Sequence, residues 1–154
     1  MQTEIYTKQR VGINGQISKA ESQYLATIQG VAIEDLTIGE PVAWANENEN
    51  EVAKLTDENK TKFVGFVVRD GYVPSCETPT EIYKAGRNVT IITKGSLWIK
   101  SELDAKQGDQ LQFENGEIIV SAFIIADTTA NPLNKWRVVA VDKDSGLIEI
   151  STEL

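Results

Sequence analysis

The apolar residues of this chain fall in short runs that are separated by turn-forming residues. The runs Val89–Thr93 and Ser96–Ile99 are rich in Val, Ile, Thr and Trp, which suit a half-buried pleated sheet. Gly95 lies between them and can adopt the positive φ of a hairpin turn. The stretch KFVGFVVRDGY is continuously apolar up to the hairpin signal Asp70-Gly71, so it predicts a strand covered on both faces. Gly65 within it predicts a bulge or a close approach of two backbones.

The C-terminal part of the chain repeats this pattern of strands and turns. It predicts a strand at Trp136–Val141, a turn at Asp142–Gly146 and a final strand at Leu147–Ser151, in which polar and apolar residues alternate. Further upstream, an apolar strand region from Glu117 to Ala126 follows Asn115-Gly116, a pair typical of two-residue hairpin turns.

Helix signals are few. Pro79–Gly86 has a cap and a stop residue that would suit one helical turn. Turn signals recur roughly every 8–12 residues, the spacing of sandwiches and barrels. The sequence therefore predicts an all-β fold, namely a compact β-sandwich or barrel of short antiparallel strands with an extended N-terminal arm and little helix.

A repeated frame marks two of the expected strands. LTIGEPVAW and DAKQGDQLQF both place an acid after a glycine, Glu40 after Gly39 and Asp109 after Gly108, and then alternate large apolar residues. The glycine can turn the chain, and the acid can accept hydrogen bonds from backbone amides of the turn. We interpret the frame as a way of entering a strand. The segments between the two copies do not match, so the frame predicts no internal repeat.

The first residues differ from the rest. Residues 1–22 contain Gly12 and Gly15, few core-sized side chains and several long polar ones, which indicates an extended arm before a single β domain at 23–154. A frayed terminus would explain this composition equally well. However, the segment is more apolar than a solvated tail requires, because it contains Ile5, Tyr6, Val11 and Ile13.

The composition of the chain limits the partners and the catalytic or metal-binding groups that it can have. The chain has 154 residues, enough for one domain, and a net charge of −8, which opposes binding to nucleic acids and to anionic membranes. It has no histidine and one cysteine, Cys76, so the usual general base and a cysteine-based zinc site are missing, and we expect no cofactor or metal. We expect neither secretion nor membrane integration, because it shows no secretory signal and no apolar run of membrane-spanning length. A lone reduced cysteine suits synthesis in the cytoplasm.

Two acidic segments could ligate calcium. NENENE, residues 46–51, offers oxygen donors, but a solvated hairpin tip explains it better because it lacks a glycine for a tight loop. DKDSG, at Asp142–Gly146, opens like an EF-hand loop, but Leu147 stands where that loop needs glycine, so a hairpin turn is favoured. Paired carboxylates would be the remaining route to catalysis, yet none of the 23 acids stands out and no catalytic motif occurs.

The large aromatic residues permit two interpretations. The three tryptophans begin or end apolar runs, and exposed tryptophans would suit a carbohydrate- or small-ligand-binding β-module, in which they would stack on sugars. Packing in the core or at a subunit interface is the favoured alternative. The aromatics expected there are Trp44, Phe66, Trp98, Phe113 and Trp136.

The order of these motifs resembles the structural cement, or head decoration, proteins of tailed bacteriophages. The resemblance runs through RVGINGQISKAESQYLATIQG, LTIGEPVAW, FVGFVVRDG, IYKAGRNVTIITKGSLWIK, AKQGDQLQF and WRVVAVDKDSGLIEIS, and so covers nearly the whole chain. Each motif is weak alone. The resemblance implies a non-catalytic, virion-borne protein on the outer surface of the head, where it would bind the major capsid protein, commonly as a homotrimer. It also implies that the arm contacts the capsid, with candidate residues Ile5, Tyr6, Lys8, Arg10, Val11, Ile13, Gln16 and Ile17.

Overall fold

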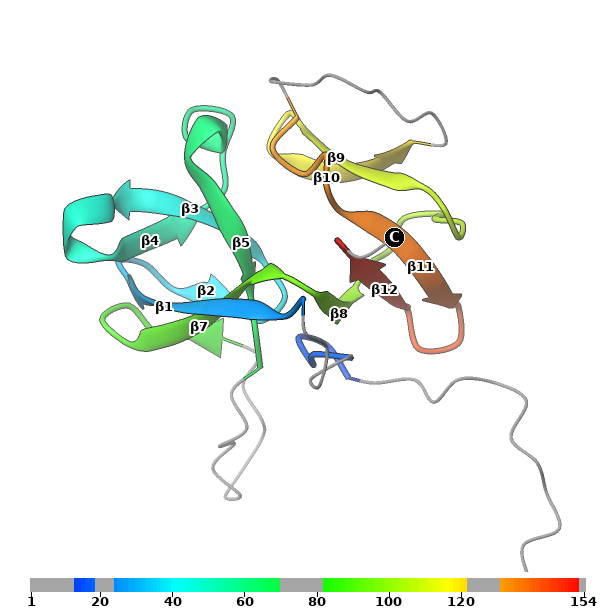
Figure 1. Cartoon of the computed structure of the whole chain (residues 1–154), viewed down its shortest axis with the longest axis horizontal. Coiled ribbons are helices and arrows are strands. Elements are labelled where there is room, and N and C mark those ends of the chain that lie inside the picture. Colours follow the sequence, from blue (N-terminus) through cyan, green and yellow to red (C-terminus); the bar gives the residue numbers. More distant parts are fainter. Residues whose placement is uncertain (1–12, 19–23, 70–81, 122–130, 153–154) are drawn as a thin grey trace, which may run out of the picture.

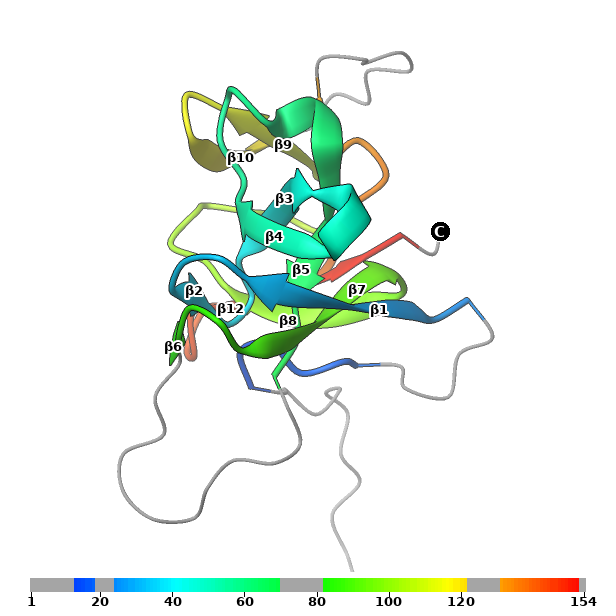
Figure 2. The ribbon, with the colours of Figure 1, turned by 90° about the vertical axis from the view of Figure 1, so that its left-hand side faces the viewer.

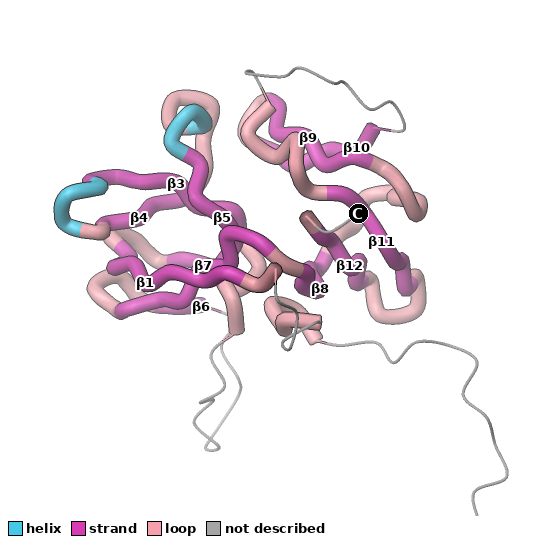
Figure 3. The backbone as a smooth tube through the Cα atoms, viewed as in Figure 1, coloured by secondary structure: helices cyan, strands magenta, loops and turns pink. Residues whose placement is uncertain are grey.

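Two larger β-sheets lie side by side in Figure 1, and a third sheet of two short strands, β2 and β6, accompanies them in the described part of the chain. The computed structural model describes residues 13–18, 24–69, 82–121 and 131–152. The strands are β1 (Ala26–Ala32), β2 (Leu36–Thr37), β3 (Pro41–Asn46), β4 (Glu51–Lys54), β5 (Phe63–Val67), β6 (Ile82–Tyr83), β7 (Asn88–Lys94), β8 (Ser96–Lys100), β9 (Gln110–Glu114), β10 (Glu117–Ser121), β11 (Arg137–Asp142) and β12 (Leu147–Ser151). Two short 3-10 helices, η1 (Glu47–Glu49) and η2 (Lys60–Lys62), lie in connections of the first sheet (Figure 3). The all-β prediction is confirmed.

The first sheet closes into a small barrel in the order β1-β4-β3-β5-β7. Its strands pair antiparallel except β1 and β4, which are parallel. Gly65 in β5 lies so close to β7 that an added Cβ would meet the carbonyl oxygen of Ile92, and the register between β3 and β5 shifts beside it. The prediction of a bulge or close approach at Gly65 is confirmed. The barrel interior is filled by small and branched apolar residues, among them Leu36, Val52 and Ile91.

The second sheet has the order β10-β9-β11-β12-β8, with every neighbouring pair antiparallel. Asn115 and Gly116 both have positive φ, 53° and 77°, and join β9 to β10 as the Asn-Gly signal predicted. The turn at Asp142–Gly146 joins β11 to β12, also as predicted, and Ser145 Oγ donates to Asp142 Oδ2 at 2.6 Å.

One nearly continuous segment links the two sheets. The expectation of a hairpin at Gly95 is wrong, because β7 pairs within the barrel whereas β8 pairs with β12 in the second sheet. The positive φ of Gly95, 130°, redirects the chain from one sheet into the other. Figure 2 shows β7 and β8 following one another along the lower side of the molecule.

A shared core holds the sheets together. It contains Phe66 and Ile92 from the barrel and Leu97, Ile148 and further apolar residues from the second sheet. The rings of Phe66 and Trp136 meet edge to face across this boundary, with centroids 4.9 Å apart. Such edge-to-face pairs add to the gain from burying the rings.

The repeated glycine-acid frame has the same geometry at both positions. Gly39 and Gly108 have positive φ, 83° and 95°. Glu40 Oε2 accepts from the backbone N–H of Thr37 at 2.9 Å, and Asp109 Oδ2 accepts from that of Lys106 at 2.9 Å. Each acid therefore bonds the amide three residues before it, which confirms the strand-entry interpretation. The following residues Leu111 and Phe113 are buried, as expected.

Two other predictions need correction. Ile82 and Tyr83, expected in a helical turn at Pro79–Gly86, form strand β6 and pair with β2, because burial of Tyr83 against the barrel outweighs the weak helix signal. The final strand, expected to be two-faced because polar and apolar residues alternate, is buried at every position from Leu147 to Ser151. The Asp70-Gly71 pair, Cys76, residues 79–81 and residues 122–126 lie outside the described residues.

Glu149 in this last strand is buried in an unusual way for a carboxylate. The residue is 1% exposed, and its Oε2 atom has no hydrogen-bond partner in the described part of the chain. A buried polar oxygen without a hydrogen-bond partner reduces the stability of the folded state.

The substitution Glu149→Gln replaces this carboxyl group by a neutral amide with little change of shape. We expect it to raise the free energy of unfolding by about 1–3 kcal/mol, measured by urea titration at neutral pH. Glu114→Gln, the same change at an exposed position of β9, is the control and should be near neutral. A loss of stability in E149Q beyond that of the control would contradict this account.

Glu40 gives a pH-dependent prediction. Burial raises the pKa of its carboxyl above 4.5, although the hydrogen bond from Thr37 opposes the rise. A carboxyl whose pKa is higher in the folded chain than in the unfolded chain favours unfolding increasingly as the pH rises from the lower pKa to the higher one. Glu40→Gln should therefore improve thermal stability, relative to the wild type, more at about pH 7 than at about pH 4. Equal effects at both pH values, as expected for the exposed control Glu47→Gln, would argue against it.

Candidate functional site

The base of the N-terminal arm forms part of the second sheet. Residues 13–18, here called the arm root, run antiparallel to β8, with Ile17 opposite Leu97. Gly15 N donates to Trp98 O at 2.7 Å, and Trp98 N donates to Gln16 O at 2.9 Å. Ser18 N donates to Ser96 O at 3.0 Å. The arm root therefore covers the edge of β8 that would otherwise be unpaired.

Asn14 ties the arm root to both sheets. Its side-chain Nδ2 donates to the carbonyl of Ile38, in the turn that enters β3 of the barrel, at 3.0 Å. Its Oδ1 accepts from the backbone N–H of Lys100, at the end of β8, also at 3.0 Å. Asn14 is 7% exposed, so both bonds are shielded from water and their loss would leave polar groups without partners.

Two glycines make room for this contact. A Cβ on Gly39 would lie 2.6 Å from Asn14 Oδ1, and a Cβ on Gly15 would overlap Ile38. Arg69, which follows β5, closes the other side: its backbone N–H donates to Gly15 O at 2.8 Å and its Nε to Asn14 O at 2.9 Å. The arm root is thus held by backbone and side-chain bonds to elements far apart in the sequence.

The predicted arm residues differ in their placement. Ile13 is 53% exposed, Gln16 has an exposed side chain that accepts from Ile13 N at 3.0 Å, and Ile17 is half-buried against the shared core. The structure brings these three together beside β8. The other predicted arm residues, Ile5, Tyr6, Lys8, Arg10 and Val11, lie outside the described residues.

The arm root and the turn between β11 and β12 lie at the same end of the second sheet. Lys100, which bonds Asn14, is opposite Leu147 in β12, and Leu147 is opposite Asp142 in β11. Three strand spacings of about 4.8 Å place this turn roughly 14 Å from the arm root. The arm root begins at Ile13, at this same end of the sheet. The exposed residues Lys100 and Lys143 therefore lie at the end of the sheet where the arm joins the body.

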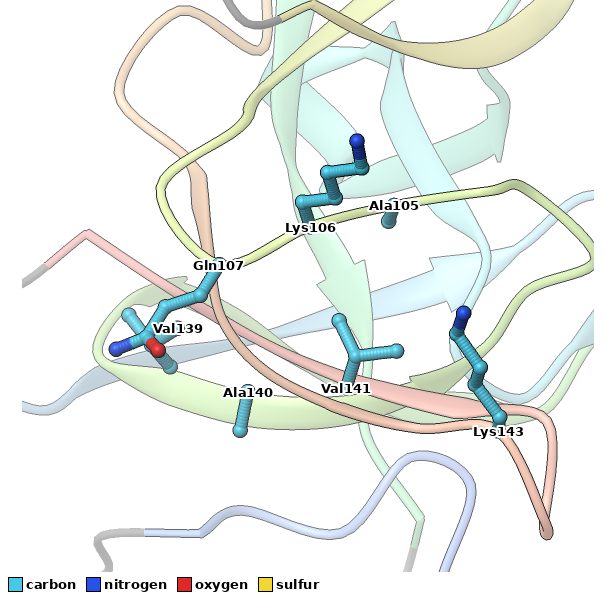
Figure 4. Close-up of a pocket in the computed structure, with 7 residues that line it drawn as sticks. All are labelled: Ala105, Lys106, Gln107, Val139, Ala140, Val141 and Lys143. Atoms are coloured by element: carbon cyan, nitrogen blue, oxygen red, sulfur yellow. The ribbon is translucent and has the colours of Figure 1, made fainter.

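A shallow pocket of about 530 Å³ opens at this side of the sheet, between β11 and the preceding segment 105–107 (Figure 4). Val139, Ala140 and Val141 of β11 form one wall, and Ala105 and Gln107 belong to the other. Lys106 and Lys143 complete the lining, and Figure 4 shows both side chains extending to the same side of β11. The pocket thus combines apolar side chains with two cationic groups.

The two acidic segments considered as calcium ligands form turns. Asn46–Glu51 spans the tip between β3 and β4, where Asn46 Oδ1 accepts from Asn48 N and Asn50 takes a positive φ of 56°. Among the described residues, no group of three or more His, Cys, Asp or Glu side chains could hold a metal ion. In the same part of the chain, no helix is long and apolar enough to cross a membrane.

Comparison with known proteins decides the family. The model of the family "Structural cement protein (E217 gp24/Pam3 gp6)" matches residues 1–153. The chain belongs to the phage structural cement protein family. No curated protein matches it. A chain in the capsid of Myoviridae phage XM1 has the same fold, with a TM-score of 0.65 and 12% identity over 99% of this chain and 96% of that one. The N base of the phage phi29 head fibre gp8.5 scores 0.47 at 10% identity, over 82% and 92% of the two chains.

Membership of this family confirms the resemblance seen in the ordered motifs. The cement protein is a structural component of the phage capsid, associates with capsid proteins and is part of the virion. A structural cement family also indicates a non-catalytic role.

The aromatic residues of this cement protein are mostly internal. Phe66, Trp98, Phe113 and Trp136 are 0–6% exposed, and Trp44 is half-buried against the barrel core. Stacking on a sugar needs an exposed ring face. The buried tryptophans Trp98 and Trp136 do not offer one, which weakens the sugar-binding alternative.

Sequence reasoning missed three features of this site. Asn14-Gly15 is visible as a turn-forming pair, but its contact partners Ile38 and Lys100 are distant in the sequence. No sequence motif marked the two lysines of the pocket as site residues. The sequence indicated that Gly39 turns the chain into a strand, but it did not indicate that Gly39 also makes room for Asn14.

Loss of the Asn14 side chain tests the connection between the sheets. We expect Asn14→Ala to lower the free energy of unfolding by roughly 2–4 kcal/mol, because Ile38 O and Lys100 N lose their partner in a shielded position. Chemical denaturation measures this value. Asn88→Ala, at an exposed position of β7, provides the control. If both variants are equally stable, Asn14 does not hold the sheets together.

Proposed function

We propose that this cement protein decorates the outer surface of the assembled head, as a homotrimer, and stabilises the shell by binding the major capsid protein through residues 1–12. The observation that carries the proposal is the anchoring of the arm root. Because residues 14–18 are bonded to both sheets, the segment before Ile13 starts from a fixed point on a rigid body. A segment attached in this way can transmit binding energy to the whole domain.

The charge and polarity of the arm support the same proposal. Residues 1–22 carry three basic and two acidic side chains, whereas the whole chain has a net charge of −8. The arm therefore has a net charge of +1 in an acidic protein. Its apolar residues Ile5, Tyr6 and Val11 could be buried against a partner, and an extended segment also offers backbone hydrogen bonds.

The proposed trimer would bring several arms to one head. Linked binding modules increase the overall affinity because each further contact is intramolecular. In this proposal the protein is made in the host cytoplasm and is added to heads that lie in the same compartment.

Removal of residues 2–12 tests the arm. We expect the truncated protein to keep its fold and melting temperature, because it retains the bonds that join residues 14–18 to both sheets, and to lose at least about tenfold in affinity for heads that lack the protein. Co-sedimentation with purified heads measures binding, and sedimentation equilibrium of the free protein measures the trimer.

A variant with residues 2–12 in scrambled order keeps length and charge and is the matched control. It should bind more weakly than the wild type if the sequence of the arm matters. Full binding by the truncated protein would overturn the role of the arm, and a monomeric mass would overturn the trimer.

A further inference from the structure

The pocket beside β11 coincides with an open strand edge. β11 pairs with β12 from Arg137 to Asp142, with a register shift between Val138 and Ala140, but its pairing with β9 is limited to Arg137 opposite Gln110. The turn before β9 adds two bonds at Val138, from Gly108 N to Val138 O and from Val138 N to Asp109 O. Beyond Val138 the segment 105–107 leaves β11, and no strand among the described residues pairs with this edge.

The pocket lies beside an open strand edge and has an apolar wall. Its apolar wall is formed by Val139–Val141, and the backbone of these residues forms the open edge. A strand edge beside a pocket can accept an extended peptide, which gains main-chain hydrogen bonds from the edge and specificity from the pocket. The open stretch is short, which keeps the edge from being a general site of aggregation.

The charges at the groove indicate which peptide would fit. Lys106 and Lys143 make no ion pair with any described residue. Among the acids close to them in sequence, Asp109 Oδ2 accepts from Lys106 N and Asp142 Oδ2 accepts from Ser145 Oγ. None of the described residues that line the pocket is an acid. Two free ammonium groups beside an apolar wall favour a segment that carries carboxylates next to apolar residues.

The position of the groove suggests the protein that supplies this segment. The β11–β12 turn carries Lys143 and lies at the sheet end from which the arm root departs. If residues 1–12 reach along the head surface, this sheet end faces the same surface. The whole chain has a net charge of −8, so two lysines beside an apolar wall form a local basic site on an acidic protein.

We infer that the groove between β11 and residues 105–107 binds an extended acidic segment of the capsid shell protein, which adds to the edge of β11 at Val139–Val141. This inference rests on the proposed function, because it requires binding to the head. It names a second contact that is separate from the arm.

A double charge reversal tests the groove. We expect Lys106→Glu with Lys143→Glu, in the full-length protein, to weaken binding to heads that lack the protein by about tenfold or more and to reduce its sensitivity to salt. Lys60→Glu with Lys62→Glu makes the same charge change at η2 in the barrel and should bind nearly as the wild type does. Hydrogen exchange on bound and free wild-type protein should show slower exchange of the amides of Val139–Val141 in the bound state.

The outcomes separate the two proposals. If the wild type binds heads but the K106E/K143E variant binds equally well, the groove inference fails and the proposed function stands. Weaker binding without protection of the Val139–Val141 amides would overturn strand addition. A change in the mass of the free oligomer in the K106E/K143E variant would assign the groove to a second copy of this chain and overturn the capsid segment. If the wild type does not bind heads at all, the proposed function fails and the inference with it.

Discussion

The side-chain amide of Asn14 is the interaction on which the arrangement of the molecule depends. It donates to the barrel at Ile38 and accepts from the second sheet at Lys100, so one planar group fixes the distance between two sheets. The shared core supplies much more buried area, but apolar contacts do not specify orientation by themselves. Directional bonds in a shielded position do, because each misalignment leaves a buried polar group without a partner.

Local structure was predictable from the sequence where the chemistry is local. The Asn115-Gly116 hairpin, the glycine-acid frame and the strands at the C-terminus follow from residue types that are adjacent in the chain. The choice of sheet for β8 was not predictable in this way. Gly95 permits both a hairpin and a change of sheet, and the choice depends on the pairing of Ser96–Lys100 with a strand about fifty residues later.

The candidate site was predictable only in part, for the same reason. The apolar residues of the arm marked it as more than a tail, and the ordered motifs indicated the family. The bonds that make residues 14–18 part of the body join Asn14 and Gly15 to Ile38, Arg69 and Lys100. Such pairings have no signature in a single sequence. Buried Glu149 was hidden similarly, because alternation predicts which residues share a face but not whether that face is covered.

The pairing of the arm root with β8 has a mechanical consequence. Hydrogen bonds between antiparallel strands run perpendicular to the strand direction. Tension applied to residues 1–12 along the strand axis would therefore act on the bonds of Gly15, Gln16 and Ser18 together and would not open them one after another. The same tension would reach the barrel through Arg69 and Ile38, so the force on one short segment is divided between both sheets. When a protein is attached by such an arm, both of its sheets bear the load, so detachment by force is resisted by the whole fold and not by the arm root alone.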